Sequence, residues 1–137
     1  MPFVLDASVT AGWCFPDEDQ RTSDAALSRL AEDTAVVPTL WWFEVRNILV
    51  VNERRGRVDA AGTAEFLAEL DRLPILMDRD PDSETVVALA RKHGLTAYDA
   101  AYLELARRLA APLATLDQAL VAAAQRDGID LIGAGTD

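Results

Sequence analysis

Short apolar runs alternate with longer amphipathic segments along the chain. The runs are three or four residues long and predict strands at 3–5, 35–37, 75–77, 113–116 and 129–132. The segments between them have apolar residues at helical spacing and predict helices at 9–13, 20–32, 39–55, 59–72, 82–94, 96–111 and 118–127, with a loop at 16–19. Capping residues mark helix ends: Thr39, Asp59 and Thr96 at N-termini, and Gly56 and Gly94 after C-termini.

The alternation of strands and helices predicts the fold class. We expect an α/β fold, a three-layer α/β/α domain with a central, mostly parallel sheet of about five strands. The predicted strands are apolar throughout, which indicates a sheet covered on both faces. The 137 residues contain no repeat, linker or low-complexity tract, so we expect one domain over residues 1–137.

Composition narrows the class of protein. Hydrophobic residues make up 50% and charged residues 26% of the chain, which is ordinary for a domain with a buried core. No apolar run is long enough to span a bilayer, and no basic segment precedes Asp6 as a secretory signal would require. Cys14 is the only cysteine, which excludes an intramolecular disulfide. We therefore expect a cytoplasmic protein without a membrane segment.

The strongly acidic charge bears on possible partners. The net charge is −10 and the sequence pI is about 4.4. Such a surface repels nucleic-acid phosphates, so the charge alone argues against nucleic-acid binding. Two explanations would reconcile the acidic charge with nucleic-acid binding. Some acids could bind cations that cancel their charge, or the surface could attract a basic protein partner.

Four acidic residues fall where the predicted sheet would place a site. Asp6 and Asp117 directly follow strands, Asp99 lies in the first turn of its helix, and Glu44 lies just past the first turn of another. Sites in parallel α/β sheets form outside the carboxyl ends of the strands. The starts of these helices face the same edge, so the topology directs all four carboxylates to one region.

Each acid also has a plainer interpretation that the sequence leaves open. Asp117 before a helix and Asp6 after a strand are placed to cap helices. Asp99 near the start of a helix complements the helix dipole. Glu44 has unusually apolar neighbours, but it could lie on a solvated stripe with Asn47.

Convergence of the four acids would favour a bound cation, because clustered carboxylates repel one another. Ligation by carboxylates alone suits Mg²⁺ or Mn²⁺. Such a site suits phosphodiester hydrolysis: one ion can activate a water, and a second, ~4 Å away, can stabilise the leaving oxygen. Zinc is disfavoured because His93 and Cys14 are the only residues of their kinds, and His93 beside Gly94 is better explained as a partner of the helix dipole.

The sequence also resembles a known family over nearly its whole length. The resemblance rests on residues 3–8 (FVLDAS), 42–47 (WFEVRN), 96–102 (TAYDAAY) and 114–117 (ATLD). The third segment is the most specific, and the order and spacing of all four make the match. On these segments the chain is similar to PIN-domain ribonucleases, specifically to the VapC-type toxins of type II toxin–antitoxin pairs.

The resemblance implies a PIN-like fold and a metal-dependent endoribonuclease. The residues that it implies for the acidic Mg²⁺ or Mn²⁺ site are Asp6, Glu44, Asp99 and Asp117. It also implies that Ser8 or Thr115 supports the site by hydrogen bonding. A helix cap and a buried strand hydroxyl are the plainer alternatives for these two.

The resemblance further implies an RNA substrate, a homodimer and a cognate antitoxin. In this family the antitoxin inserts a segment near the site, sometimes with an arginine among the acids, which agrees with the charge of −10. The residues that could line such a groove, or instead fill the core, are Trp13, Phe15, Trp41 and Trp42. The only dense basic cluster, Arg54, Arg55 and Arg57, could contact RNA or complement a helix dipole.

Three other classes of protein can be compared with this sequence. A response-receiver domain would need an aspartate after the third strand, where Asp78 stands, and a lysine after the fifth, but the only lysine is Lys92 in a helix. A haloacid-dehalogenase-like phosphatase needs a second aspartate as general acid where Ser8 stands. A PIN-fold protein that binds RNA or a partner without cutting stays open as the alternative function.

Overall fold

The fold is that of a computed structural model, described for residues 1–16 and 20–133; residues 17–19 of the expected loop lie outside the described part. The strands are β1 (Phe3–Leu5), β2 (Ala35–Pro38), β3 (Ile75–Asp78) and β4 (Leu113–Ala114). The helices are α1 (Ala7–Cys14), α2 (Arg21–Arg29), α3 (Thr39–Arg54), α4 (Ala60–Asp71), α5 (Ser83–His93), α6 (Ala97–Leu109) and α7 (Gln118–Arg126). No helix in these ranges is long and apolar enough to cross a bilayer.

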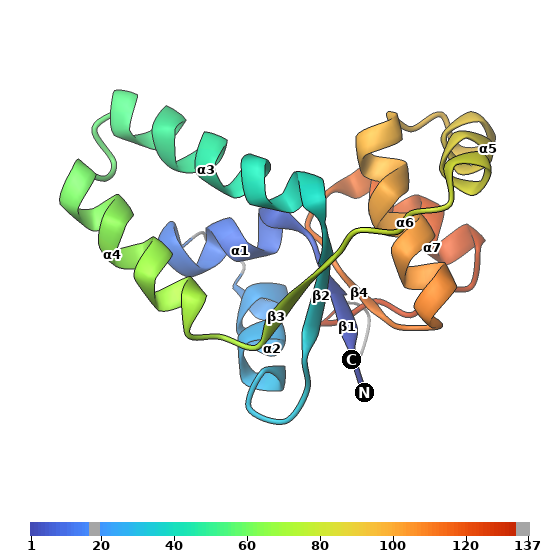
Figure 1. The fold of residues 1–137 in the computed structure, drawn as a ribbon, viewed down its shortest axis with the longest axis horizontal. Coiled ribbons are helices and arrows are strands. Elements are labelled where there is room, and N and C mark those ends of the chain that lie inside the picture. Colours follow the sequence, from blue (N-terminus) through green and yellow to red (C-terminus); the bar gives the residue numbers. More distant parts are fainter. Residues whose placement is uncertain (17–19, 134–137) are drawn as a thin grey trace.

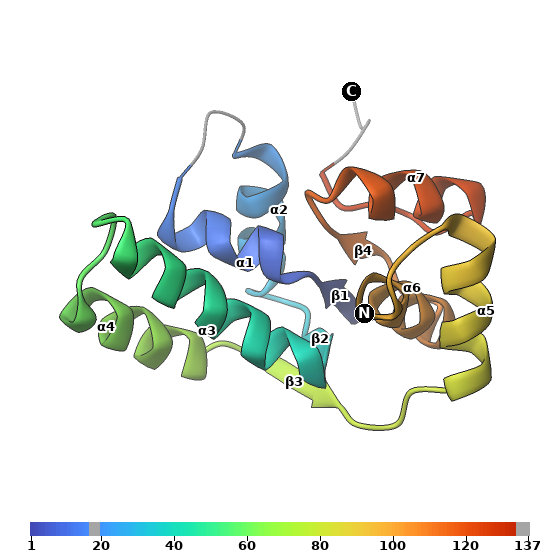
Figure 2. The same cartoon turned by 90° about the horizontal axis from the view of Figure 1, so that it is seen from above.

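The sheet forms the middle layer of an α/β/α arrangement. Its strand order is β3-β2-β1-β4, and all the pairings are parallel. Helices α1 to α4 lie on one side of the sheet and α5 to α7 on the other (Figures 1 and 2). The predicted fold class is therefore confirmed.

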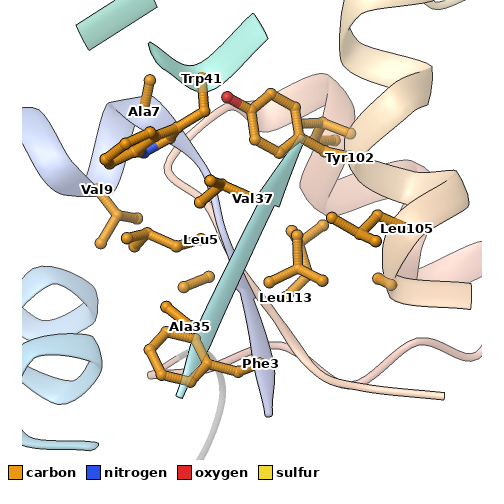
Figure 3. Packing of buried hydrophobic residues seen from close by; sticks show 14 of the residues in the cluster. Phe3, Leu5, Ala7, Val9, Ala35, Val37, Trp41, Tyr102, Leu105 and Leu113 are labelled. Atoms are coloured by element: carbon orange, nitrogen blue, oxygen red, sulfur yellow. The ribbon is translucent and has the colours of Figure 1, made fainter. Parts of the chain in front are cut away.

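The apolar strands lie in the core, as their sequence predicts. Phe3, Val4 and Leu5 of β1 are fully buried because β1 lies between two strands and under both helical layers. Their side chains pack among residues of both layers, including Trp41 and Tyr102 (Figure 3). Burying one such large side chain stabilises the fold by roughly 1.5–3 kcal/mol. The edge strand β3 differs, because it is less covered: Leu76 is 62% exposed.

The C-terminal part of the sheet is shorter than expected. Instead of a fifth strand at 129–132, one parallel bridge joins Leu131 to Leu113. Strand β4 ends at Ala114 and does not reach Leu116. The reason is that the next backbone amides pair with hydroxyl groups: Leu116 N donates to Ser8 Oγ at 3.0 Å and Asp117 N to Thr115 Oγ1 at 3.0 Å.

Most of the expected helix ends are present. Asp59 accepts from Gly62 N and Thr96 from Asp99 N, as N-caps do. Gly56 follows α3 with φ +73°, a left-handed conformation that glycine adopts without strain. The expectation for Thr39 was wrong by one position: Pro38 is the N-cap, and Thr39 is the first residue of α3.

Candidate functional site

The structure brings the four candidate acids together around one hollow at the carboxyl edge of the sheet. This hollow has a volume of about 240 Å³ and is lined by Asp6, Ala7, Ser8, Glu44, Asn47, Ile48, Asp99 and Asp117. We call it the acidic hollow. Strand β1 brings Asp6 to it, and helices α3 and α6 bring Glu44 and Asp99.

Asp6 is the most deeply fixed of the four acids. It is 6% exposed, and its Oδ2 accepts hydrogen bonds from Ser8 Oγ at 2.8 Å and Thr115 Oγ1 at 2.6 Å. It occupies the N-cap position of α1, but its side chain makes no capping hydrogen bond. The capping interpretation of Asp6 was therefore wrong: two hydroxyl groups hold this carboxylate at the wall of the hollow.

The carboxylate of Glu44 is held by a tyrosine. The Tyr102 hydroxyl donates to Glu44 Oε1 over 2.5 Å, and Tyr102 is fully buried. The stripe that Glu44 shares with Asn47 is the wall of the hollow, and Glu44 itself is half-buried. Sequence reasoning missed Tyr102 as a site residue. The available signal was its position three residues after Asp99, one helical turn deeper in the same motif.

The remaining two acids combine a local role with a place in the hollow. Asp117 Oδ1 accepts from Leu120 N at 3.0 Å, so Asp117 does cap α7 as its sequence position suggested. Asp99 lies in the first turn of α6, where it complements the helix dipole. The plainer interpretations of these residues hold, and both side chains still line the hollow.

The acidic side chains give the hollow a negative charge that the other residues of its lining do not balance. Burial raises the pKa of Asp6, Glu44 and Asp99, and repulsion from neighbouring acids of the hollow adds to each increase. The pKa of Tyr102 is also raised, by burial first and then by Asp6 and its bond to Glu44. Among the described residues that line the hollow there is no Lys or Arg.

With this geometry established, the similarity to known proteins becomes informative. Residues 3–132 match the PIN domain family. This chain belongs to the PIN-domain family. The match extends over nearly all of the chain and contains all four acids, and it excludes the receiver and dehalogenase-like alternatives.

Individual PIN-domain relatives support the assignment. The chain is 34% identical over 123 residues to Ribonuclease VapC3 of Pyrobaculum aerophilum, covering 88% of this chain and 92% of the relative. The solved structure of PAE2754, also from Pyrobaculum aerophilum, superposes with a TM-score of 0.71 at 26% identity, covering 90% of this chain and 84% of the other. FitAcB from Neisseria gonorrhoeae, with a TM-score of 0.56, 19% identity and 96% coverage of both chains, supports the fold alone. The chain is thus a homologue of a VapC ribonuclease.

The donor set of this PIN domain fits a hard divalent cation. It consists of carboxylates without a competing protein cation, and carboxylate oxygens are the donors that Mg²⁺ prefers. Within residues 1–16 and 20–133, no three His, Cys, Asp or Glu side chains lie close enough together to enclose an ion. Mg²⁺ usually keeps several waters and takes one or two protein carboxylates plus substrate phosphate.

Other residues singled out in the sequence lie away from the hollow. His93, the last residue of α5, is buried with its Nε2 3.1 Å from Asp127 Oδ2, so its partner is a carboxylate. In the basic cluster, Arg54 and Arg55 end α3 about 15 Å along the helix axis from Glu44 at 1.5 Å per residue. Arg57 lies 5.1 Å over the ring of Phe15.

The four aromatic residues divide between core and surface. Trp41 is 6% exposed and donates its indole N–H to Thr10 Oγ1 at 3.0 Å. Trp13 and Phe15 are partly buried and pack against the core. Trp42 is 42% exposed, and the guanidinium of Arg46 lies 3.8 Å from its ring centroid. The core interpretation therefore applies to Trp41, Trp13 and Phe15.

Proposed function

We propose that this PIN domain, over residues 1–137, is an Mg²⁺- or Mn²⁺-dependent endoribonuclease that hydrolyses phosphodiester bonds in RNA at the acidic hollow. The observation that carries the proposal is the convergence of Asp6, Glu44, Asp99 and Asp117 on one hollow without a protein cation. Homology to a ribonuclease supports RNA as the substrate.

The acids would divide the work of holding the metal. Asp6, fixed by Ser8 and Thr115, and Glu44, fixed by Tyr102, are preorganised ligands because hydrogen bonds set the orientation of each carboxylate. Asp99 and Asp117 stand at helix starts and complete the anionic wall. The bound metal would lower the pKa of a water and stabilise the leaving oxygen. The residues themselves position the ion and leave the open side to the phosphate.

We also propose that the chain acts as a toxin in the cytoplasm, forms a homodimer and is inhibited by a cognate antitoxin. The charge of −10 and the uncompensated hollow support a partner segment that carries positive charge. An antitoxin arginine among the four acids would supply the cation that the hollow lacks and would block entry of the metal and the phosphate together.

The experiment is cleavage of total cellular RNA by the purified chain with Mg²⁺, with Mn²⁺ and with EDTA. We expect discrete fragments that require the metal and that disappear with Asp99→Asn. The matched control is Asp24→Asn, because Asp24 also lies in the first turn of a helix, α2, but outside the hollow. Circular dichroism of both variants verifies the fold.

Cleavage that survives in Asp99→Asn and Asp6→Asn would contradict the proposal. A folded, metal-loaded protein that binds RNA without cutting it would favour the alternative, a PIN-fold binding module. Thermal unfolding with increasing Mg²⁺ gives an independent readout, because a ligand that binds only the folded state raises stability by about 1.4 kcal/mol at ten times its Kd. The increase should be lost in Asp6→Asn and retained in Asp24→Asn.

A further inference from the structure

A second hollow adjoins the acidic one. It has a volume of about 490 Å³ and is lined by Leu40, Phe43, Glu44, Thr96, Tyr98 and Asp99. We call it the aromatic hollow. It shares Glu44 and Asp99 with the acidic hollow, so the two are continuous along the starts of α3 and α6.

The two aromatic side chains of this hollow are unusually exposed. Phe43 is 69% and Tyr98 is 68% exposed, whereas Trp41 and Tyr102 on the same two helices are buried in the core. Helix α3 therefore points Trp41 inward and Phe43 into solvent, with Trp42 partly exposed beside it, and α6 points Tyr102 inward and Tyr98 into solvent. The ring of Trp42 meets Phe43 edge-on, with centroids 5.0 Å apart, and limits how the Phe43 ring can turn.

Charge restricts what can bind an RNA strand at this place. No Lys or Arg is among the described residues that line either hollow, and the chain carries −10 in total. The described lining of the two hollows therefore offers no cation of its own for a phosphate next to the proposed site of cleavage. Stacking of a nucleobase on an aromatic ring does not depend on charge, and every base presents a flat face for it.

We propose that the aromatic hollow binds one unpaired nucleobase of the RNA, next to the phosphate at the acidic hollow, by stacking on Tyr98 and Phe43. This inference rests on the proposed ribonuclease function and names the class of substrate. Because the hollows share Glu44 and Asp99, a strand with its phosphate at the acids places the adjacent base in the aromatic hollow, against its rings. Thr96 is exposed, and its hydroxyl, which accepts from Asp99 N at 3.1 Å, still has its proton to donate to a base edge. A base held in a duplex cannot enter, so the site selects single-stranded segments.

The test uses single-stranded RNA oligonucleotides that span the cleavage site mapped in cellular RNA, each with one abasic nucleotide. For the unmodified protein, an abasic nucleotide at one position beside the cut lowers kcat/KM about 10-fold, as expected for the loss of one base–aromatic stack. Tyr98→Leu and Phe43→Leu show a similar loss on the intact strand and little further loss on that abasic strand. Non-additivity of this kind shows that ring and base act together.

Two variants serve as controls. Tyr98→Phe keeps the ring, so it should retain the dependence of kcat/KM on the base that Tyr98→Leu loses. Leu76→Ala removes an exposed apolar side chain of β3 that lines neither hollow, and it leaves kcat/KM and the abasic effect unchanged.

Three results would overturn the proposal. If an abasic nucleotide leaves kcat/KM unchanged at every position of the strand, no base is bound. If the loss of kcat/KM in Tyr98→Leu or Phe43→Leu adds in full to the loss caused by the abasic nucleotide, the rings act elsewhere than on that base. Variants that sediment as monomers where the unmodified protein is a dimer, with the abasic loss unchanged, show that the hollow is an interface between two copies.

Failure of the proposed function is distinguishable from failure of this inference. If the unmodified protein cuts no RNA, binding of fluorescein-labelled 12-nucleotide A and U homopolymers is measured by anisotropy. Weaker binding by Tyr98→Leu but not by Leu76→Ala supports the base site without cleavage. Equal binding by both overturns it.

Discussion

Two clusters of acidic side chains in this PIN domain differ in whether a neighbouring arginine neutralises them. In one, Arg108 donates to Glu104 Oε2 at 2.7 Å and to Asp78 Oδ2 at 2.7 Å, which ties α6 to the end of β3. In the acidic hollow, hydroxyl groups of Ser8 and Thr115 donate to Asp6, and the Tyr102 hydroxyl donates to Glu44. No Lys or Arg is among the described residues that line this hollow. One cluster includes its own cation, and the described lining of the other contains none.

The pKa shifts follow this difference. The guanidinium of Arg108 lowers the pKa of Asp78, whereas burial raises the pKa of Asp6, Glu44 and Asp99. Burial alone does not separate the clusters, because Glu104 is 2% exposed and thus more buried than Asp6 at 6%. A buried acid with an arginine partner indicates structure, and a group of acids without one indicates a binding site.

The largest effect should come from comparing one glutamate of each cluster. We expect Glu44→Gln to lower RNA cleavage by at least about 100-fold, because it removes a proposed metal ligand. In the absence of metal this variant should be as stable as the unmodified protein or more stable, because it relieves repulsion. Glu104→Gln should keep cleavage and lose stability. Cleavage kinetics and urea unfolding of both variants check this; equal activity in the two would contradict the division of roles.

A smaller effect is expected from the arginine of the paired cluster. Arg108→Met should lower the free energy of unfolding by about 2 kcal/mol, less than for a fully buried pair, because the Arg108 side chain is 31% exposed. It leaves Glu104 buried without its partner. The double variant Arg108→Met with Glu104→Leu should recover part of the loss, since no charge then stays buried. Urea unfolding gives the double-mutant cycle, and a purely additive result would show that the two do not interact.

The support of Glu44 by Tyr102 should matter less than the ligand itself. Tyr102→Phe removes the hydroxyl that orients Glu44, and we expect about 10-fold more Mg²⁺ to be needed for half-maximal cleavage, the lower end for a residue that supports a metal ligand. The matched control is Tyr98→Phe, which removes an exposed hydroxyl from the same helix. If both variants needed the same Mg²⁺ concentration for half-maximal cleavage, Tyr102 would not support Glu44 as a metal ligand.

The smallest effect concerns the pH dependence of stability without metal. Folded-state pKa values of Asp6, Glu44 and Asp99 lie above their ordinary 3.8, 4.5 and 3.8, so the folded chain binds more protons than the unfolded chain in that interval. Stability should therefore rise as the pH falls from neutral through the raised values.

The paired acids give the opposite dependence at lower pH. Asp78 and Asp127 have lowered pKa values, so their contribution is lost as the pH falls below about 3.8 through those values. Urea unfolding in EDTA, from neutral pH down through the lowered pKa values, measures both the rise in stability in mild acid and its loss at lower pH. Glu44→Gln or added Mg²⁺ should flatten the rise in mild acid, and a rise that persists in both would contradict its assignment to the acidic hollow.

Much of the acidic hollow could be predicted before the fold was known. Asp6 and Asp117 follow apolar strands, and parallel strands place their carboxyl ends at one edge. The sequence could not show which groups hold these acids. Tyr102 reaches Glu44 across 58 positions of sequence, and Thr115 reaches Asp6 across 109. Partners so far apart are set by packing, for which local patterns have no signal.

The sequence by itself determined the order of strands and helices, because apolar periodicity and capping residues act over a few neighbouring positions. It also determined which acids stand at the sheet edge. The tertiary structure decided where the sheet ends: the amides after Ala114 bond to Ser8 and Thr115, and the segment near Leu131 forms only one bridge. It also decided that Arg108 neutralises Glu104 and Asp78 and that no described arginine or lysine lines the acidic hollow. Charge pairing depends on distances in space, and only the packed helices and strands fix those distances.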